Sequence, residues 1–141
     1  MGRKKFTLYE KQFIEERAEH SCEYCKFPVT YSHDTFHIEH VIPFYLTQNN
    51  ELDNLAFAFD GCNSNKWGRT EWLDIITNSK VPLFNPRQNL WQEHFEWHDT
   101  FTIIIGKTPI GRATIDLLKM NRQGLVNIRK ALYTYGVLPI D

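Results

Sequence analysis

The chain of 141 residues predicts an α+β fold in one small domain. Three observations support this: a helix signal near the N-terminus, a strand–loop–strand–helix pattern at about residues 36–67, and a strand–helix extension over about residues 80–141. Hydrophobic residues make up 42% of the chain, enough for a core of its own. No repeat or linker separates the three parts, so we expect a single domain over residues 1–141.

The N-terminal helix is the clearest local signal. Thr7 followed by Glu10 is a capping-box pattern, so we expect a helix over about residues 8–20. A short knuckle should follow over residues 21–28. The central pattern is then interpreted as strands over residues 36–42 and 54–59, a polar loop between them, and a helix that begins near residue 62.

Short elements are expected from residue 71 to the end of the extension. We expect a helix over residues 71–77 and helices over residues 111–120 and 123–135. Two short strands should lie between these helices, over residues 93–97 and 101–105.

The charge pattern leaves two interpretations of the last third of the chain. The formal net charge is −1, which disfavours tight nonspecific binding to nucleic acid. Between residues 107 and 130, however, Asp116 is the one acid among six basic residues. They form either an ordinary solvated face or a local phosphate-binding surface. The six are Lys107, Arg112, Lys119, Arg122, Arg129 and Lys130.

Composition also suggests a compartment. Three cysteines are an odd number and argue against a disulfide scaffold. We find no signal-peptide pattern, and the apolar runs are too short to cross a membrane. The expected location is a reducing cytoplasm, with no membrane partner.

The residues that carry chemistry lie between Cys22 and Lys66. Glu39 stands beside His40, Asn54 follows the polar loop, and Asn63 follows a cysteine. Such groups can hold one divalent cation and one general base, which suffices to hydrolyse a phosphodiester. The alternative is that Glu39 and His40 are ordinary polar strand residues and that Asn63 is a helix N-cap.

The order and spacing of these residues resemble the HNH endonuclease family. The resemblance implies a ββα-metal (His-Me finger) unit, with Glu39 and Asn63 as ligands of a catalytic Mg²⁺ or Mn²⁺. It also implies that His40 is the general base that activates water, while Asn54 braces the loop and orients the histidine. Phosphate or other nucleic-acid contacts are expected from His37, Lys66, Arg69 and Arg112. Arg112 could instead pair with Glu93, Glu96 or Asp116.

The cysteines depart from the family pattern. Cys22 and Cys25 form a Cys-x-x-Cys pair, but the second pair of many members is incomplete here, because Phe59 stands three positions before Cys62. A structural Zn²⁺ on the three thiolates would need a fourth ligand. Otherwise the thiols pack as small hydrophobic groups. The candidate fourth ligands are His20, His33, His37 and Asp60.

The function implied is a metal-dependent endonuclease acting on DNA, with double-stranded DNA as the expected substrate and a homodimer or a partner protein as its expected assembly. Two alternatives stay open. One is a noncatalytic zinc-knuckle module that binds nucleic acid or a partner, and the other is a nuclease subunit that is active only with a partner.

Overall fold

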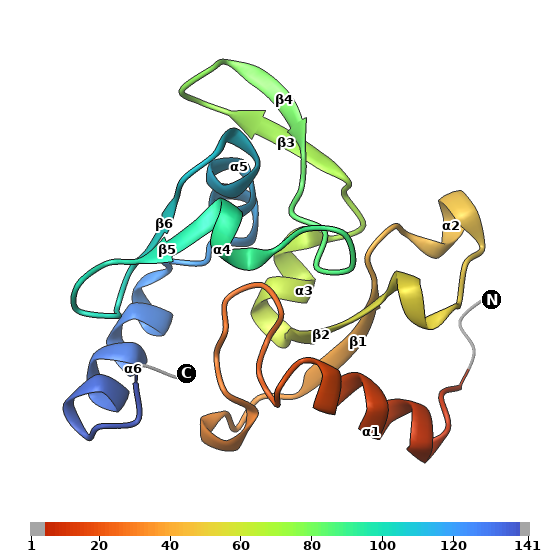
Figure 1. Cartoon of the computed structure of the whole chain (residues 1–141), viewed down its shortest axis with the longest axis horizontal. Coiled ribbons are helices and arrows are strands. Elements are labelled where there is room, and N and C mark those ends of the chain that lie inside the picture. The colour runs from red at the N-terminus through yellow and green to blue at the C-terminus, as the bar shows by residue number, and fades with distance from the viewer. Residues whose placement is uncertain (1–4, 139–141) are drawn as a thin grey trace. The chain divides into compact units, whose positions relative to one another are not determined.

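The computed structural model describes residues 5–138, which divide into two compact units (Figure 1). The first unit comprises the described residues up to Thr70 together with Asn85–Asn89, and the second comprises Glu71–Phe84 and the residues from Leu90 onward. Both units contain helices and strands, which confirms the α+β class. The expectation of a single domain stays a prediction. No helix of the described residues is long and apolar enough to cross a membrane.

The first unit begins with α1 (Leu8–Arg17), and the capping box is present as predicted. The Thr7 hydroxyl accepts from the Glu10 backbone N–H at 3.1 Å, and the Glu10 carboxylate accepts from the Thr7 N–H at 2.9 Å. The helix ends three residues earlier than predicted, because Glu19 and His20 both adopt left-handed backbone angles.

The predicted ββα unit is formed by β1 (Phe36–His40), β2 (Leu55–Phe59) and α3 (Asp60–Lys66). The strands are antiparallel, and His40 pairs with Leu55. Helix α1 packs on β2, and α3 packs on both strands (Figure 1). The core between α1 and β2 is built from Ile14, Ala18, Leu55 and Phe57. The shorter elements of this unit are η1 (Val29–Tyr31), α2 (Phe44–Thr47) and η2 (Leu52–Asn54).

The second unit differs from the prediction at its start. Residues 71–77 are not a helix; β3 (Glu71–Asp74) pairs with β4 (Ser79–Pro82) in an antiparallel hairpin. Trp72 and Asp74 share one face of β3 and both bond to α5 (Pro109–Leu118), so the side-chain period here is two.

The rest of the second unit contains the predicted strands and helices with shifted bounds, and it adds one short helix, α4, that was not predicted. Its elements are α4 (Trp91–His94), β5 (Phe95–Trp97), β6 (Ile104–Gly106), α5, and α6 (Gln123–Thr134). Helix α5 approaches the backbone closely at Gly111, where an added Cβ would lie 2.1 Å from the carbonyl oxygen of His94.

Candidate active site

A pocket of about 290 Å³ lies at the end of β1 in the first unit. It brings together Glu39 and His40 from the strand and Asn63 from α3, three residues that the sequence assigned to one site. The other residues that line it are Pro43, Phe44, Tyr45 and Gly68. Helix α3 begins at Asp60 with Phe59 as its N-cap residue, so the alternative that Asn63 caps the helix is wrong.

Glu39 and His40 reach the same pocket although they are neighbours in sequence. Adjacent side chains of a strand point to opposite faces, but β1 ends at His40 and the chain bends before Pro43. Both side chains are largely buried, with 5% of Glu39 and 7% of His40 exposed. The bend therefore turns the last strand residue into the pocket.

The Glu39 carboxylate is held by two buried donors. The Tyr24 hydroxyl donates to Oε2, and the Lys66 ammonium donates to Oε1 at 3.0 Å. Lys66 also donates to the carbonyl oxygen of Val41 at 2.9 Å, and its side chain is only 3% exposed. This burial argues against the predicted contact between Lys66 and nucleic acid, because the ammonium binds groups inside the unit. Burial, followed by the charge of Glu39, raises the pKa of Tyr24 well above its usual value.

The His40 ring is oriented by a residue that sequence reasoning missed. Its Nε2 lies 2.7 Å from the side-chain oxygen of Asn50, and Phe44 packs against the ring at 5.5 Å between centroids. Asn54 braces the loop through hydrogen bonds to its backbone rather than to the His40 ring. Its amide donates to the carbonyl oxygens of Ile42 and Asn49 at 2.9 and 3.0 Å, and its oxygen accepts from the Ile42 N–H at 2.9 Å.

The remaining predicted nucleic-acid contacts differ in their surroundings. His37 lies 2.6 Å from an oxygen of Asp60, and Arg69 is exposed just after α3. Arg112 belongs to the second unit, where it binds Asp74 through two hydrogen bonds of 2.9 and 3.0 Å. Its partner is none of the three acids considered from the sequence. The Arg112 guanidinium is a structural group of that unit, which argues against its predicted role at phosphates.

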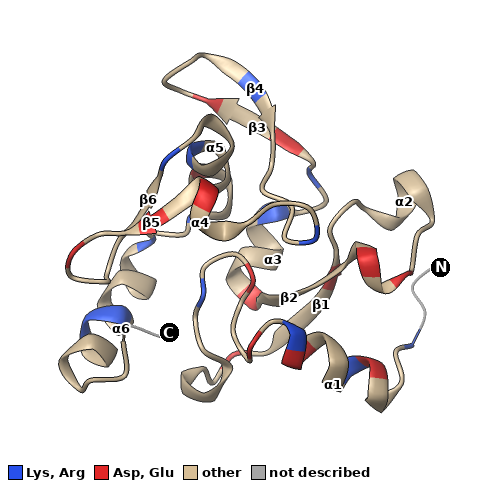
Figure 2. Cartoon of the chain, in the orientation of Figure 1, with Lys and Arg blue, Asp and Glu red and all other residues tan. Residues whose placement is uncertain are grey.

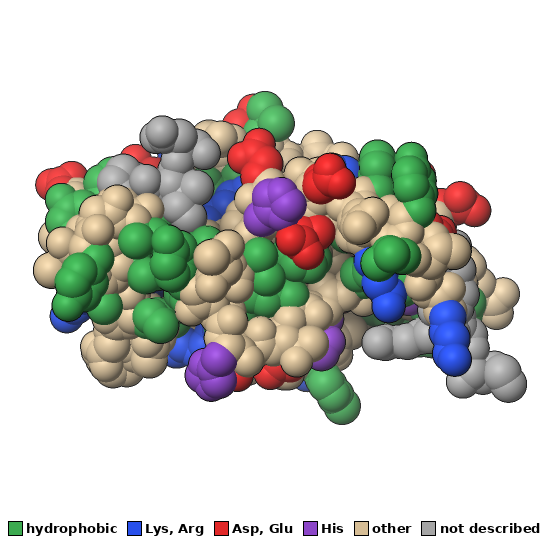
Figure 3. Space-filling model, turned by 90° about the horizontal axis from the view of Figure 1, so that it is seen from below, with side chains coloured by type: hydrophobic (Ala, Val, Ile, Leu, Met, Phe, Trp, Pro, Cys, Tyr) green, Lys and Arg blue, Asp and Glu red, His purple; other side chains and the backbone are tan. Residues whose placement is uncertain are grey.

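The basic residues between residues 107 and 130 do not form one open phosphate-binding surface. Arg129 is buried and donates to the carbonyl oxygens of Thr102 and Met120, while Arg122 donates to that of Lys119. Blue positions are spread over several elements in Figure 2, and on the face drawn in Figure 3 the basic side chains lie apart from one another among other types.

The three cysteines form a buried cluster. The sulfur atoms of Cys22, Cys25 and Cys62 lie within 4.8 Å of one another, and none of these residues is exposed. Burial raises the pKa of Cys22 to about 12, so this thiol is protonated at neutral pH unless a metal replaces the proton. Such a cluster can hold a metal ion.

No fourth ligand joins the cluster among the described residues. His20 bonds to Glu15, and His37 bonds to Asp60. The side chain of His33 is 99% exposed. Phe59, which stands where many HNH members have a cysteine, packs against Phe27 with ring centroids 5.2 Å apart.

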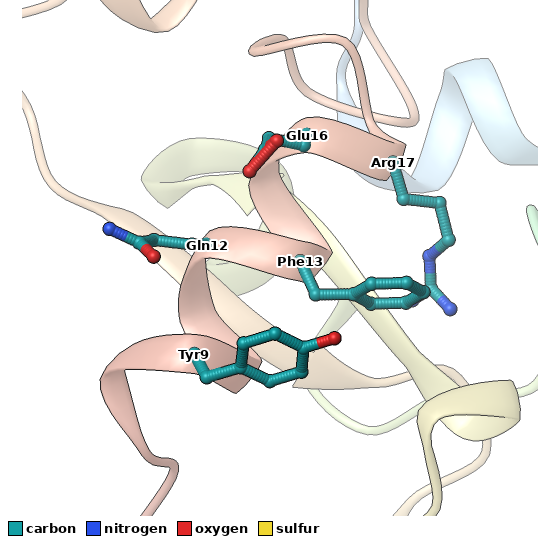
Figure 4. A pocket seen from close by; sticks show the side chains of 5 residues that line it. All are labelled: Tyr9, Gln12, Phe13, Glu16 and Arg17. Carbon is teal, nitrogen blue, oxygen red and sulfur yellow. The ribbon is translucent and has the colours of Figure 1, made fainter.

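A second hollow, of about 530 Å³, lies along α1 (Figure 4). Arg17 joins α1 to η2 and to the first residue of β2 by donating to the carbonyl oxygens of Leu52 and Leu55 at 2.9 and 2.7 Å. The guanidinium also stacks 5.5 Å from the centre of the Phe13 ring. The contacts of Arg17 are packing contacts, and the predicted catalytic residues do not line this hollow.

Comparison with known proteins agrees with the geometry. Residues 22–69 match the family model described as HNH endonuclease. This segment contains the cysteine cluster, β1, β2 and α3, and it is similar to the HNH family. An HNH domain indicates a metal-dependent nuclease. No curated protein and no solved structure matches the chain.

Proposed function

We propose that the protein is a metal-dependent endonuclease that hydrolyses phosphodiester bonds in DNA, with double-stranded DNA as the expected substrate. The observation that carries the proposal is the convergence of Glu39, His40 and Asn63 on one pocket within the segment that matches the HNH family. A histidine, a carboxylate and an amide at one pocket supply a general base and oxygen ligands for a hard cation.

The residues fit a divalent cation. Each oxygen of Glu39 accepts one hydrogen bond and keeps a further lone pair, and Asn63 lines the same pocket. Oxygen donors in this number suit Mg²⁺ or Mn²⁺, and when bound the ion would offset negative charge on the phosphate. Neutral His40 then takes the proton from the attacking water, while Asn54 holds the loop that closes the site.

The cysteine cluster supports a second, structural metal. Three buried sulfur atoms within 4.8 Å of one another suit Zn²⁺, which binds thiolates readily. A bound ion would tie the knuckle around Cys22 and Cys25 to α3, which carries Cys62 and Asn63.

One observation keeps a partner-dependent nuclease as the second candidate function. Lys66, Arg112 and Arg129, which the sequence offered as charges for phosphates, are each engaged within their own unit. Weak intrinsic affinity for DNA would follow from this. A nuclease that is recruited to DNA by a partner protein would keep the same catalytic residues and would need fewer free charges.

The test is plasmid cleavage by purified protein with Mg²⁺, Mn²⁺ or EDTA. We expect metal-dependent nicking or linearisation, and His40→Ala should lower the rate by about a hundredfold to ten-thousandfold because it removes the general base. His33→Ala is the matched control, since that side chain is 99% exposed. A folded His40→Ala protein that cleaves like the wild type would reject the role of His40. No cleavage by any folded, metal-loaded form would favour the partner-dependent alternative.

A further inference from the structure

We propose that Asn50 is the positioning residue of the site and that it fixes which nitrogen of His40 carries the proton. The observation is the 2.7 Å contact between His40 Nε2 and Asn50 Oδ1. An amide oxygen only accepts hydrogen bonds, so Nε2 must be the donor. A neutral imidazole carries one proton, and Nδ1 therefore holds the lone pair that can accept a proton from water. The catalytic consequence rests on the proposed function.

The loop is built to hold Asn50 in place. The carbonyl oxygen of Asn49 accepts from the Asn54 amide at 3.0 Å, and the Asn49 side chain accepts from the Glu51 N–H at 2.8 Å. Hydrogen bonds thus fix the backbone on both sides of Asn50. The N–H of Asn54 also donates to the Glu51 carbonyl oxygen at 2.9 Å.

Asn54 also fixes the segment that follows His40. The Asn54 side chain accepts from the N–H of Ile42 and donates to the carbonyl oxygen of Ile42, both at 2.9 Å. The backbone carbonyl oxygen of Asn54 accepts from the Val41 N–H at 2.9 Å. Asn54 therefore joins the two segments that carry the ring and its acceptor. It acts on the histidine through Asn50, which makes the direct contact. Phe44 limits the remaining freedom of the ring by packing edge-on against it.

The test reads the tautomer directly. Nitrogen-15 NMR of histidine-labelled protein at about pH 8.5, above the ordinary histidine pKa of about 6.5, distinguishes a protonated from a bare ring nitrogen. The chain has six histidines, and His40→Gln assigns the signal. We expect the proton of His40 on Nε2. Asn50→Leu, which has a similar shape without an acceptor, should lose this preference, while Asn50→Asp should keep it because it retains the acceptor oxygen.

Activity gives the second measurement. Asn50→Leu should lower kcat by about tenfold to a hundredfold, the usual loss when a partner that orients a histidine is removed, with a smaller change in KM. Thr47→Val is the matched control, because Thr47 accepts from the Asn49 N–H in the same loop and does not bond to the ring in the contacts described. It should change neither the tautomer nor kcat.

The two proposals can fail separately. A proton found on Nδ1 in the wild type, or an Asn50→Leu protein that keeps the Nε2 tautomer, would overturn the role of Asn50 whether or not DNA is cleaved. If Asn50→Leu does not fold, the wild type and Asn50→Asp still decide: both must show the proton on Nε2. A wild type with the expected tautomer but no nuclease activity would reject the proposed function and leave the positioning of His40 intact.

Discussion

The position of Lys66 in the sequence and its surroundings in the fold indicate different roles for this residue. From sequence it is a basic residue at the end of a nuclease motif, and a contact with phosphate is the natural expectation. In the fold its ammonium lies under the pocket, 3.0 Å from Glu39. A buried charge that lacks a partner is strongly unfavourable, so this ion pair holds the site carboxylate in one place.

Removing the ammonium should therefore lower the stability of the fold. We expect Lys66→Met to lower the free energy of unfolding by about 3–5 kcal/mol, the usual effect of removing one partner of a buried ion pair. Urea denaturation followed by circular dichroism measures it. Lys11→Met, at an exposed position of α1, is the control and should change stability by less than about 0.5 kcal/mol. Equal stability of the Lys66 and Lys11 variants would show that the ion pair contributes little.

The cysteines give a prediction about metal content. Freshly purified protein should contain one equivalent of zinc, and Cys62→Ser should lose it, because all three thiolates bind the same ion. Zinc affinity should rise with pH, since binding must displace protons from thiols such as Cys22, whose pKa is raised to about 12. Elemental analysis and chelator competition at two pH values measure both effects. Zinc-free protein with an unchanged melting temperature would mean that the thiols only pack.

At the scale of a residue, sequence reasoning found the groups whose neighbours in the chain identify them. Glu39, His40 and Asn63 stand in local patterns, and the pocket contains all three. Asn50 could not be found this way, because it follows Asn49 in a polar loop where either side chain suits a turn. The partner of Arg112 was also missed, because Asp74 lies 38 residues away in sequence.

At the scale of an element, the same contrast separates helices from hairpins. The capping box and the apolar faces of α5 and α6 are encoded within each segment, and these helices were predicted. The sequence predicts a helix from Glu71, but the segment is a strand whose pairing with Ser79–Pro82 is not visible within the segment itself. The period-two pattern of Trp72 and Asp74 extends over too few residues to decide the question from sequence.

Helix α5 offers a sharp test of close packing. We expect Gly111→Ala to destabilise the protein by about 1–3 kcal/mol or more, because the new methyl group would lie 2.1 Å from a backbone oxygen. Gly124→Ala is the matched control in α6, where nothing lies within 4 Å of the added atom, and it should stabilise by up to about 1 kcal/mol. Thermal melting of the two variants should therefore shift in opposite directions. A Gly111→Ala protein as stable as the wild type would contradict this close approach.

At the scale of the whole molecule, internal ion pairs engage several of the charged residues of a near-neutral sequence. Glu39 with Lys66 and Glu23 with Arg87 lie within the first unit, and Asp74 with Arg112 lies within the second. Each pair joins residues far apart in sequence. The chain therefore uses several of its charges to hold its own elements together, which leaves fewer of them for a partner such as DNA.

The Asp74 pair should make stability depend on pH in one direction. Hydrogen bonds from Arg112 and then from Thr77 hold the pKa of Asp74 well below its usual value of about 3.9. A carboxyl whose pKa is lower in the folded than in the unfolded state stabilises the fold above the unfolded pKa, and this contribution is lost as pH falls toward the folded pKa. We expect Asp74→Asn to be clearly less stable than the wild type at pH 7.

The difference between the two proteins should stay constant down to about pH 5 and then shrink below about pH 4, because the wild type alone loses the contribution of the ionised carboxylate. Urea denaturation at pH 7, 5, 4 and 3 measures it. Asp99→Asn, an exposed acid of the same unit, is the control and should change stability little at each pH. A difference between wild type and Asp74→Asn that stays constant to pH 3 would mean that the hydrogen-bonded shape of this side chain, rather than its charge, ties β3 to α5.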